Sequence, residues 1–280
     1  MGINTTMRST SERAEHLLGL LGSPIKPHLP AVSRFLVVAT FYEDAIRIMY
    51  QWSDQVRYLE KVRHFPGYTA SIFLGFNALS MILFASCIIL KRQVGPSVAV
   101  LASVIIGQAI AYGLVFDLMF FLRNLSVTGG LLLCMSESLL RKKSRNKQSS
   151  MFASLPQLTV SERDKYFQLA GRVLLVLLFL GFILNGEWNY LRMVVSFVGL
   201  AACGMVVVGF RAKWSATFLV SLLCIINMLV NNWWSASHSN YKRDFLRYDF
   251  FQCLSIMGGL LLLVSIGPGG LSYDEKKKEF

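Results

Sequence analysis

Charged side chains that interrupt an apolar stretch near the N-terminus are the first candidates for chemistry. Glu43 and Asp44 precede Arg47 by four and three residues, so on a helix the three share one face. Ionisable residues inside a membrane helix are costly and usually serve a function. Two interpretations follow: an ion pair in which Arg47 is the structural partner, and carboxylates that contact a ligand.

Polar residues later in the chain extend this pattern. Asp117 lies near the end of the apolar stretch 97–122, and Asn227 and Asn231 align at i and i+4 within the stretch 214–234. With the carboxylates of the first stretch, they fall in the halves of the helices that we assign to the lumenal side. We interpret them as the polar lining of a lumenal binding cavity. An interfacial belt of polar and aromatic residues is the alternative.

The sequence contains neither a catalytic nor a metal-binding pattern. Its four histidines are scattered outside the apolar stretches, without metal-ligand spacing. The five cysteines all lie inside apolar stretches, and no pair has the Cys-x-x-Cys spacing of a redox or zinc site. We expect a protein that is not an enzyme and that holds no metal and no cofactor.

The composition places these residues in a membrane. Hydrophobic residues make up 54% of the 280 and charged residues only 16%, whereas a soluble domain carries about 25% charged residues. A helix needs about 20 residues to cross the hydrocarbon core. We predict an all-α, polytopic transmembrane helix bundle of eight spans, at 31–51, 68–90, 97–122, 124–140, 167–184, 188–210, 214–234 and 250–267. Six or seven spans are the alternatives, because the first and fourth stretches contain charged residues.

Basic residues lie mostly in short segments between the apolar stretches, which is the distribution of the positive-inside rule. An even number of spans with both termini in the cytosol puts most of them on the cytosolic side. The domains are then a cytosolic segment 1–30, a bundle 31–267 with a basic cytosolic loop 141–166, and a cytosolic tail 268–280. The net charge of +12 does not indicate nucleic-acid binding, since no basic face of a soluble fold accompanies it.

Two further patterns predict helix surfaces. Apolar residues at helical spacing predict an amphipathic helix on the lumenal membrane surface, ended by Pro66 and Gly67: Trp52, Val56, Leu59 and Val62. Small residues repeat every four positions in the third stretch and predict a close approach by another helix: Ala99, Ser103, Gly107 and Ala111.

The C-terminal tail contains a second kind of site, a short signal that another protein would bind. Lys277 and Lys278 are the fourth and third residues from the end of the chain. Two ammonium groups at a fixed distance from a terminal carboxylate, on a short cytosolic tail, form the Lys-Lys-x-x retrieval signal. We predict that these two lysines return the protein to the endoplasmic reticulum.

Four blocks of sequence resemble the Surfeit-locus-four family over nearly the whole chain. They are Phe41-Tyr42-Glu43-Asp44-Ala45-Ile46-Arg47, Asn231-Asn232-Trp233-Trp234, Phe245-Leu246-Arg247-Tyr248-Asp249-Phe250-Phe251-Gln252, and the end from Gly267-Pro268-Gly269-Gly270 to Lys277-Lys278-Glu279-Phe280. The resemblance implies a membrane receptor that binds soluble secretory proteins in the lumen through a short apolar signal near the cargo's mature N-terminus.

The same resemblance implies the route and the partners. The receptor would load cargo into coat-protein-II vesicles and return from the intermediate compartment or cis-Golgi by coatomer binding to the dilysine tail. Glu43, Asp44, Asp117, Asn227 and Asn231 then become the candidate cargo site. The rival interpretation is a lipid transporter, scramblase or lipid-homeostasis protein of the early secretory pathway, because a polar groove could also pass head groups. The sequence leaves the oligomeric state open.

Overall fold

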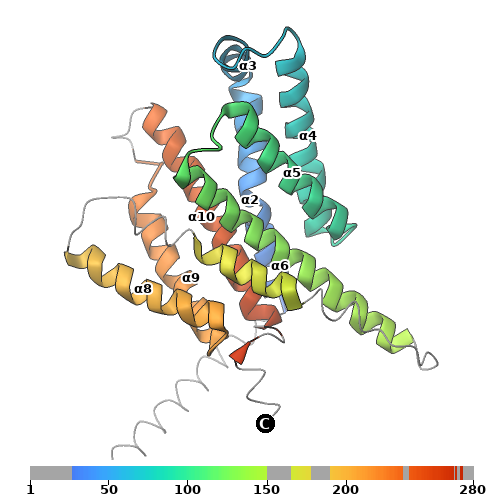
Figure 1. The fold of residues 1–280 in the computed structure, drawn as a ribbon, viewed down its shortest axis with the longest axis vertical. Helices are drawn as coiled ribbons and strands as arrows, with labels where there is room; N and C mark the ends of the chain where they lie inside the picture. Colours follow the sequence, from blue (N-terminus) through green and yellow to red (C-terminus); the bar gives the residue numbers. More distant parts are fainter. Residues whose placement is uncertain are drawn as a thin grey trace, which may run out of the picture.

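The computed structural model describes residues 27–149, 165–177, 190–235, 240–267, 269, 272 and 273, and within these ranges every regular element is a helix (Figure 1). The helices are α2 (Leu29–Tyr50), α3 (Trp52–Lys61), α4 (Thr69–Ile89), α5 (Val94–Tyr112), α6 (Leu118–Ser149), a helix over 165–177, α8 (Tyr190–Val208), α9 (Ala212–Val230) and α10 (Asn240–Ile266). The dilysine pair and residues 1–26 lie outside the described ranges.

Four of the described helices are long and apolar enough to cross a membrane. They are α4, α5, α9 and the part of α10 from Lys242 to Ile266. The all-helical membrane architecture is therefore confirmed. Helix α2 is 22 residues long, but its four charged side chains exclude it from this group.

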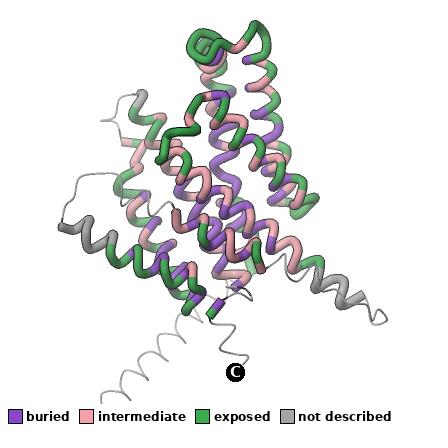
Figure 2. Tube along the Cα trace, viewed as in Figure 1, coloured by how far each residue is buried: buried purple, intermediate pink, exposed green. Residues whose placement is uncertain are grey.

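Helix α2 lies at the centre of the bundle and packs along α10 and α4 (Figure 1). Buried residues line α2, α10 and the middle of α6, while the outer faces of α4, α5, α8 and α9 are largely exposed (Figure 2). Gly258 on α10 allows α2 to come close, because a Cβ atom there would lie 2.5 Å from the backbone nitrogen of Val37. Gly129 and Gly171 do the same for α6 and the helix over 165–177.

The small-residue stripe of α5 is not used in this way. Ala99 and Ser103 are exposed, and only Ala111 of the four is buried. The face that packs inward carries larger apolar residues, among them Leu101 and Val104. The expected close approach of a helix to this stripe is thus not found among the described residues.

Helix boundaries differ from several of the predicted spans. The stretch 97–122 is broken after Tyr112, where Gly113 takes a left-handed φ of 70° and ends α5, a conformation that glycine adopts without strain. The next helix starts at Leu118 and continues through the basic residues to Ser149, so part of the predicted loop 141–166 is helical. Basic residues are good helix formers, which allows this extension.

Helix α10 begins ten residues before the predicted span, at Asn240 instead of 250. Its first turns therefore place charged residues on the same helix as the apolar, membrane-spanning part. Helix α3 agrees with the helix predicted after the first span, and its Leu59 is fully buried, but it ends at Lys61, before Val62 and the predicted end at Pro66. Figure 1 shows α3 at one end of the bundle, and we call this the α3 end.

Candidate functional site

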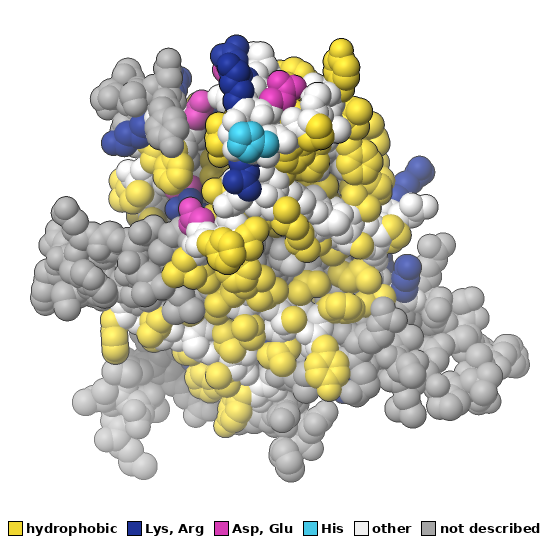
Figure 3. All heavy atoms as spheres, turned by 45° about the horizontal axis from the view of Figure 1, so that its top comes forward, with side chains coloured by type: hydrophobic (Ala, Val, Ile, Leu, Met, Phe, Trp, Pro, Cys, Tyr) yellow, Lys and Arg dark blue, Asp and Glu magenta, His cyan; other side chains and the backbone are white. Residues whose placement is uncertain are grey.

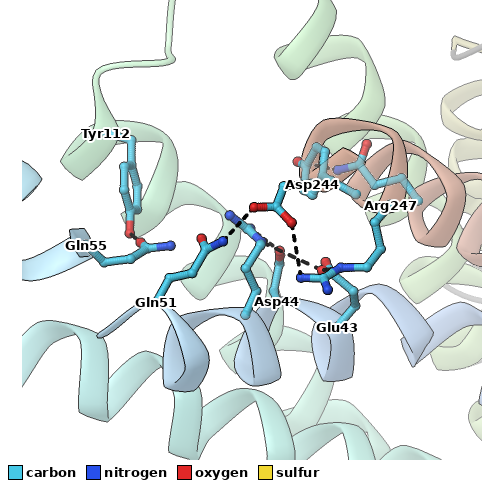
Figure 4. A network of polar contacts seen from close by, with 10 residues as sticks. Glu43, Asp44, Gln51, Gln55, Tyr112, Asp244 and Arg247 are labelled. Atoms are coloured by element: carbon cyan, nitrogen blue, oxygen red, sulfur yellow. Dashed lines mark hydrogen bonds and ion pairs between the residues drawn. The ribbon is translucent and has the colours of Figure 1, made fainter. Parts of the chain in front are cut away.

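An ion-pair network joins α2 to α10 near the α3 end (Figure 4). On α2, Arg47 Nη2 donates to Asp44 Oδ1 at 2.5 Å, and Arg47 Nε lies 3.8 Å from Glu43 Oε1. From α10, Arg247 Nε donates to the same Glu43 oxygen at 3.0 Å. A carboxylate on α2 is thus paired with the guanidinium of a residue that lies 204 positions later in the chain.

Amide and hydroxyl groups extend this network to α3 and α5. Gln51 Nε2 donates to Asp244 Oδ2 at 2.7 Å, and Asp244 also lies 4.0 Å from Arg247 Nη2. The Tyr112 hydroxyl at the end of α5 donates to Gln55 Oε1 on α3 (Figure 4). These contacts tie the ends of four helices together.

A further layer of polar contacts lies along the same part of α10. The Arg47 guanidinium stacks over the Tyr248 ring, 5.4 Å from its centroid, and Gln252 Nε2 donates to the Tyr248 hydroxyl at 2.5 Å. Arg123 on α6 forms an ion pair with Asp249. The first turns of α10 are therefore bonded to α2 and to α6.

Burial makes this pairing energetically important. Glu43 is only 6% exposed, and desolvation of an ionised carboxylate costs several kcal/mol unless a cation compensates. Its second oxygen, Oε2, is buried without a hydrogen-bond partner among the described residues. Glu43 thus depends for its compensation on Arg47 and Arg247.

The two asparagines form a separate contact on α9. Asn231 Nδ2 donates to Asn227 Oδ1 at 2.8 Å, and Asn227 Nδ2 donates to the backbone oxygen of Phe250 on α10 at 3.2 Å. Beside them, the rings of Trp234 and Phe250 meet edge to face at 5.8 Å. This pair joins α9 to α10, and none of its hydrogen bonds reaches the carboxylates of α2.

Asp117 stands apart from both groups. Its Oδ1 accepts the backbone N–H of Phe120 at 3.0 Å, the usual role of an aspartate before the first turn of a helix. The residue is exposed, and the neighbouring Phe116 is 98% exposed. The five predicted site residues therefore lie toward one end of the bundle without forming one cluster.

Sequence reasoning missed the α10 half of the network. Asp244 and Arg247 lie between the predicted spans 214–234 and 250–267, whereas in the structure they occupy the first turns of a continuous helix. Their spacing of three residues, on one helix face, was the available signal. Lys277 and Lys278 lie outside the described residues, so the retrieval signal stays a prediction.

The surface divides into a charged end and an apolar flank (Figure 3). Lysine, arginine, acidic and histidine side chains gather over the α3 end, and hydrophobic side chains cover much of the flank below it. Within the described ranges no group of His, Cys, Asp and Glu is arranged to hold a metal ion. The arrangement offers a polar, charge-paired helix end as the candidate surface for a ligand.

Comparison with known proteins gives matches over almost the full length. A sequence profile of the SURF4 family matches residues 4–280. A Surfeit locus protein 4 homolog of Schizosaccharomyces pombe is 42% identical over 91% of this chain and 84% of the relative. The ER-derived vesicles protein ERV29 of Saccharomyces cerevisiae is also 42% identical, over 91% of this chain and 78% of that protein.

A Surfeit locus protein 4 homolog of Drosophila melanogaster is 36% identical over 90% of this chain and 91% of the relative. No solved structure gives a significant match.

Proposed function

Because this chain belongs to the SURF4 family, we propose that it is a cargo receptor of the endoplasmic reticulum and not an enzyme. It is a membrane protein of the early secretory pathway that takes part in transport by ER-derived vesicles. The observation that supports this most strongly is the similarity, over 91% of this chain, to a yeast protein named for those vesicles. The receptor binds soluble secretory proteins in the lumen and enters coat-protein-II vesicles with them.

The transport cycle needs a recognition site on each side of the membrane: a cargo site in the lumen and a retrieval signal in the cytosol. Eight spans put both termini in the cytosol, where coatomer binds Lys277 and Lys278 and returns the receptor from the intermediate compartment and cis-Golgi. The α3 end then faces the lumen, in agreement with the basic residues at the other end. Release of cargo requires a difference in affinity between compartments, because a ligand shifts an equilibrium only by differential binding.

The cargo site lies at the α3 end and contains two kinds of residue. Glu43 and Asp44 are held by arginines, so they fix α2 against α10 and shape the site from within. Asp117 is exposed beside the exposed Phe116, where a carboxylate and an apolar surface are both accessible. A cargo signal with apolar side chains and a nearby ammonium group would complement this pair. Asn227 and Asn231 lie at the neighbouring contact between α9 and α10, which their hydrogen bonds stabilise.

A lipid transporter is the second candidate, because a polar helix end could also contact lipid head groups. A small gap among the helix over 165–177, α8, α9 and α10 is lined by apolar residues, among them Leu175, Cys203, Leu219 and Ile256. Its free volume is about 10 Å³, the size of one water molecule, so it does not hold an acyl chain.

Comparison of the secreted proteins of cells with and without this chain tests the two candidates. A receptor predicts the loss of a defined set of soluble proteins, restored by the parent sequence. A lipid role predicts a uniform decrease of secretion, together with lipid scrambling by the purified protein in liposomes. Uniform change with scrambling would overturn the receptor proposal.

A further inference from the structure

The end of the bundle opposite α3 holds cations around a single carboxylate. Arg34 Nη1 and Arg141 Nη2 both donate to Glu137 Oε1, each at 2.6 Å. Arg34 lies in the first turns of α2, and Glu137 and Arg141 lie one turn apart on α6. None of these residues belongs to the network at the α3 end.

Lys91, in the turn between α4 and α5, is a third cation at this place. Lys91 is exposed, and partial desolvation and the charges of Arg34 and Arg141 lower its pKa, while Glu137 acts in the opposite direction. The turn holds Lys91 in the left-handed region at a φ of 59°. Arg34, Lys91 and Arg141 around Glu137, which we call the basic cluster, carry two positive charges in excess.

One buried donor of the basic cluster lacks an acceptor among the described residues. Arg34 is 2% exposed, and its Nε is buried without a hydrogen-bond partner among the described residues. A desolvated guanidinium with an unmet donor is costly. The other described carboxylates cannot help, because they lie on α3, in the last turns of α2, just before α6 and in the first turns of α10.

We propose that the basic cluster binds the phosphate group of an anionic phospholipid from the leaflet at this end. A phosphate presents several strong acceptor oxygens, and the planar guanidinium fork matches their geometry. The excess positive charge also attracts an anionic leaflet. The proposal concerns the end away from the cargo site and does not depend on the receptor function.

The apolar face of α4 favours a lipid over a free anion. Leu79, Leu83 and Leu90 are exposed on this helix, which ends beside Lys91. From Leu79 to Leu90 a helix rises about 16 Å, which is close to half of a hydrocarbon core of about 30 Å. The acyl chains of a lipid bound through its phosphate have an apolar surface of matching length.

Native mass spectrometry of the full-length protein in detergent, with equal amounts of phosphatidic acid and phosphatidylcholine, tests the proposal. The parent should retain phosphatidic acid preferentially. The double variant Lys91→Gln/Arg141→Gln leaves the Arg34–Glu137 pair intact and removes two cations. Its preference should fall about tenfold for each charge-assisted hydrogen bond lost.

The matched control is Arg57→Gln/Lys61→Gln, which removes two exposed cations from α3 at the opposite end. It should keep the preference of the parent. Equal loss in both double variants would show a general effect of net charge and would overturn the proposal. Displacement of the lipid by inorganic phosphate at the same concentration would also overturn it, because the site would then bind an anion without its lipid. In an otherwise native sequence, Arg141→Lys keeps the charge and should retain part of the preference that the double variant loses.

Discussion

Arg247→Gln should destabilise the protein by removing the cation that α10 supplies to Glu43. The guanidinium lies 3.0 Å from Glu43 Oε1 and 4.0 Å from Asp244, and its loss leaves Glu43 with Arg47 alone at 3.8 Å. Removal of one partner from a buried ion pair costs about 3–5 kcal/mol. Because the Arg247 side chain is 29% exposed, we expect a smaller loss, of about 2–3 kcal/mol.

Thermal unfolding of the purified protein in detergent measures this loss. An unfolding entropy of about 2.1 cal/mol/K per residue, applied to 280 residues, converts 2–3 kcal/mol into a decrease of the midpoint by about 3–5 °C. The control is Arg57→Gln on α3, which removes an ion pair with Asp54 at 3.8 Å between largely exposed side chains. An exposed pair contributes at most about 1 kcal/mol, so this midpoint should move by less than about 2 °C.

The double variant Glu43→Gln/Arg247→Gln separates lost pairing from lost packing. Both charges are then gone, and no carboxylate is buried without its cation, so the double variant should be more stable than Arg247→Gln alone. Arg247→Gln with the midpoint of Arg57→Gln, or a double variant that is less stable than the parent by the sum of the two single effects, would refute a coupled ion pair between α2 and α10.

The other predictions concern the cycle and the cargo site. Lys277→Ser/Lys278→Ser should move the protein forward to the Golgi in immunofluorescence, with unchanged thermal stability; an unchanged distribution would disprove the retrieval signal. Epitope tags and cysteine labelling should find both termini in the cytosol and residues 235–249 in the lumen, and termini on opposite sides would disprove eight spans. Asp117→Asn and Asn231→Ala should each lower co-purification of cargo while the protein still leaves the endoplasmic reticulum; normal cargo export by both would contradict the assigned site.

Apolar periodicity was sufficient to find the helices but not their ends. The stretch 97–122 reads as one span because Leu114, Val115 and Phe116 are as apolar as the residues on either side. The break comes from Gly113, whose left-handed φ ends α5, and from Asp117, which caps the helix that follows. Both are single-residue signals that a hydropathy window of about 19 residues averages away.

Close approach of helices was predicted at the wrong stripe for a related reason. A repeat of small residues shows where a helix can approach, but the partner decides whether it does. On α10, Gly258 faces the backbone of α2 near Val37, and a methyl group would collide there. On α5 the outer positions Ala99 and Ser103 meet no described helix. The sequence shows which helix surfaces are small enough for a close approach. The packing of the whole bundle determines at which of them another helix actually approaches.

The central position of α2 follows from the same dependence on partners. Judged alone, its charges make it a poor membrane span, and a count of apolar residues gives no reason to bury it. The structure compensates those charges at both ends, with Arg247 of α10 against Glu43 and Glu137 of α6 against Arg34. Because the compensating residues come from helices far along the chain, α2 becomes stable in the bundle only when α6 and α10 are in place. Removal of a charge at either end is therefore expected to weaken the packing of α2.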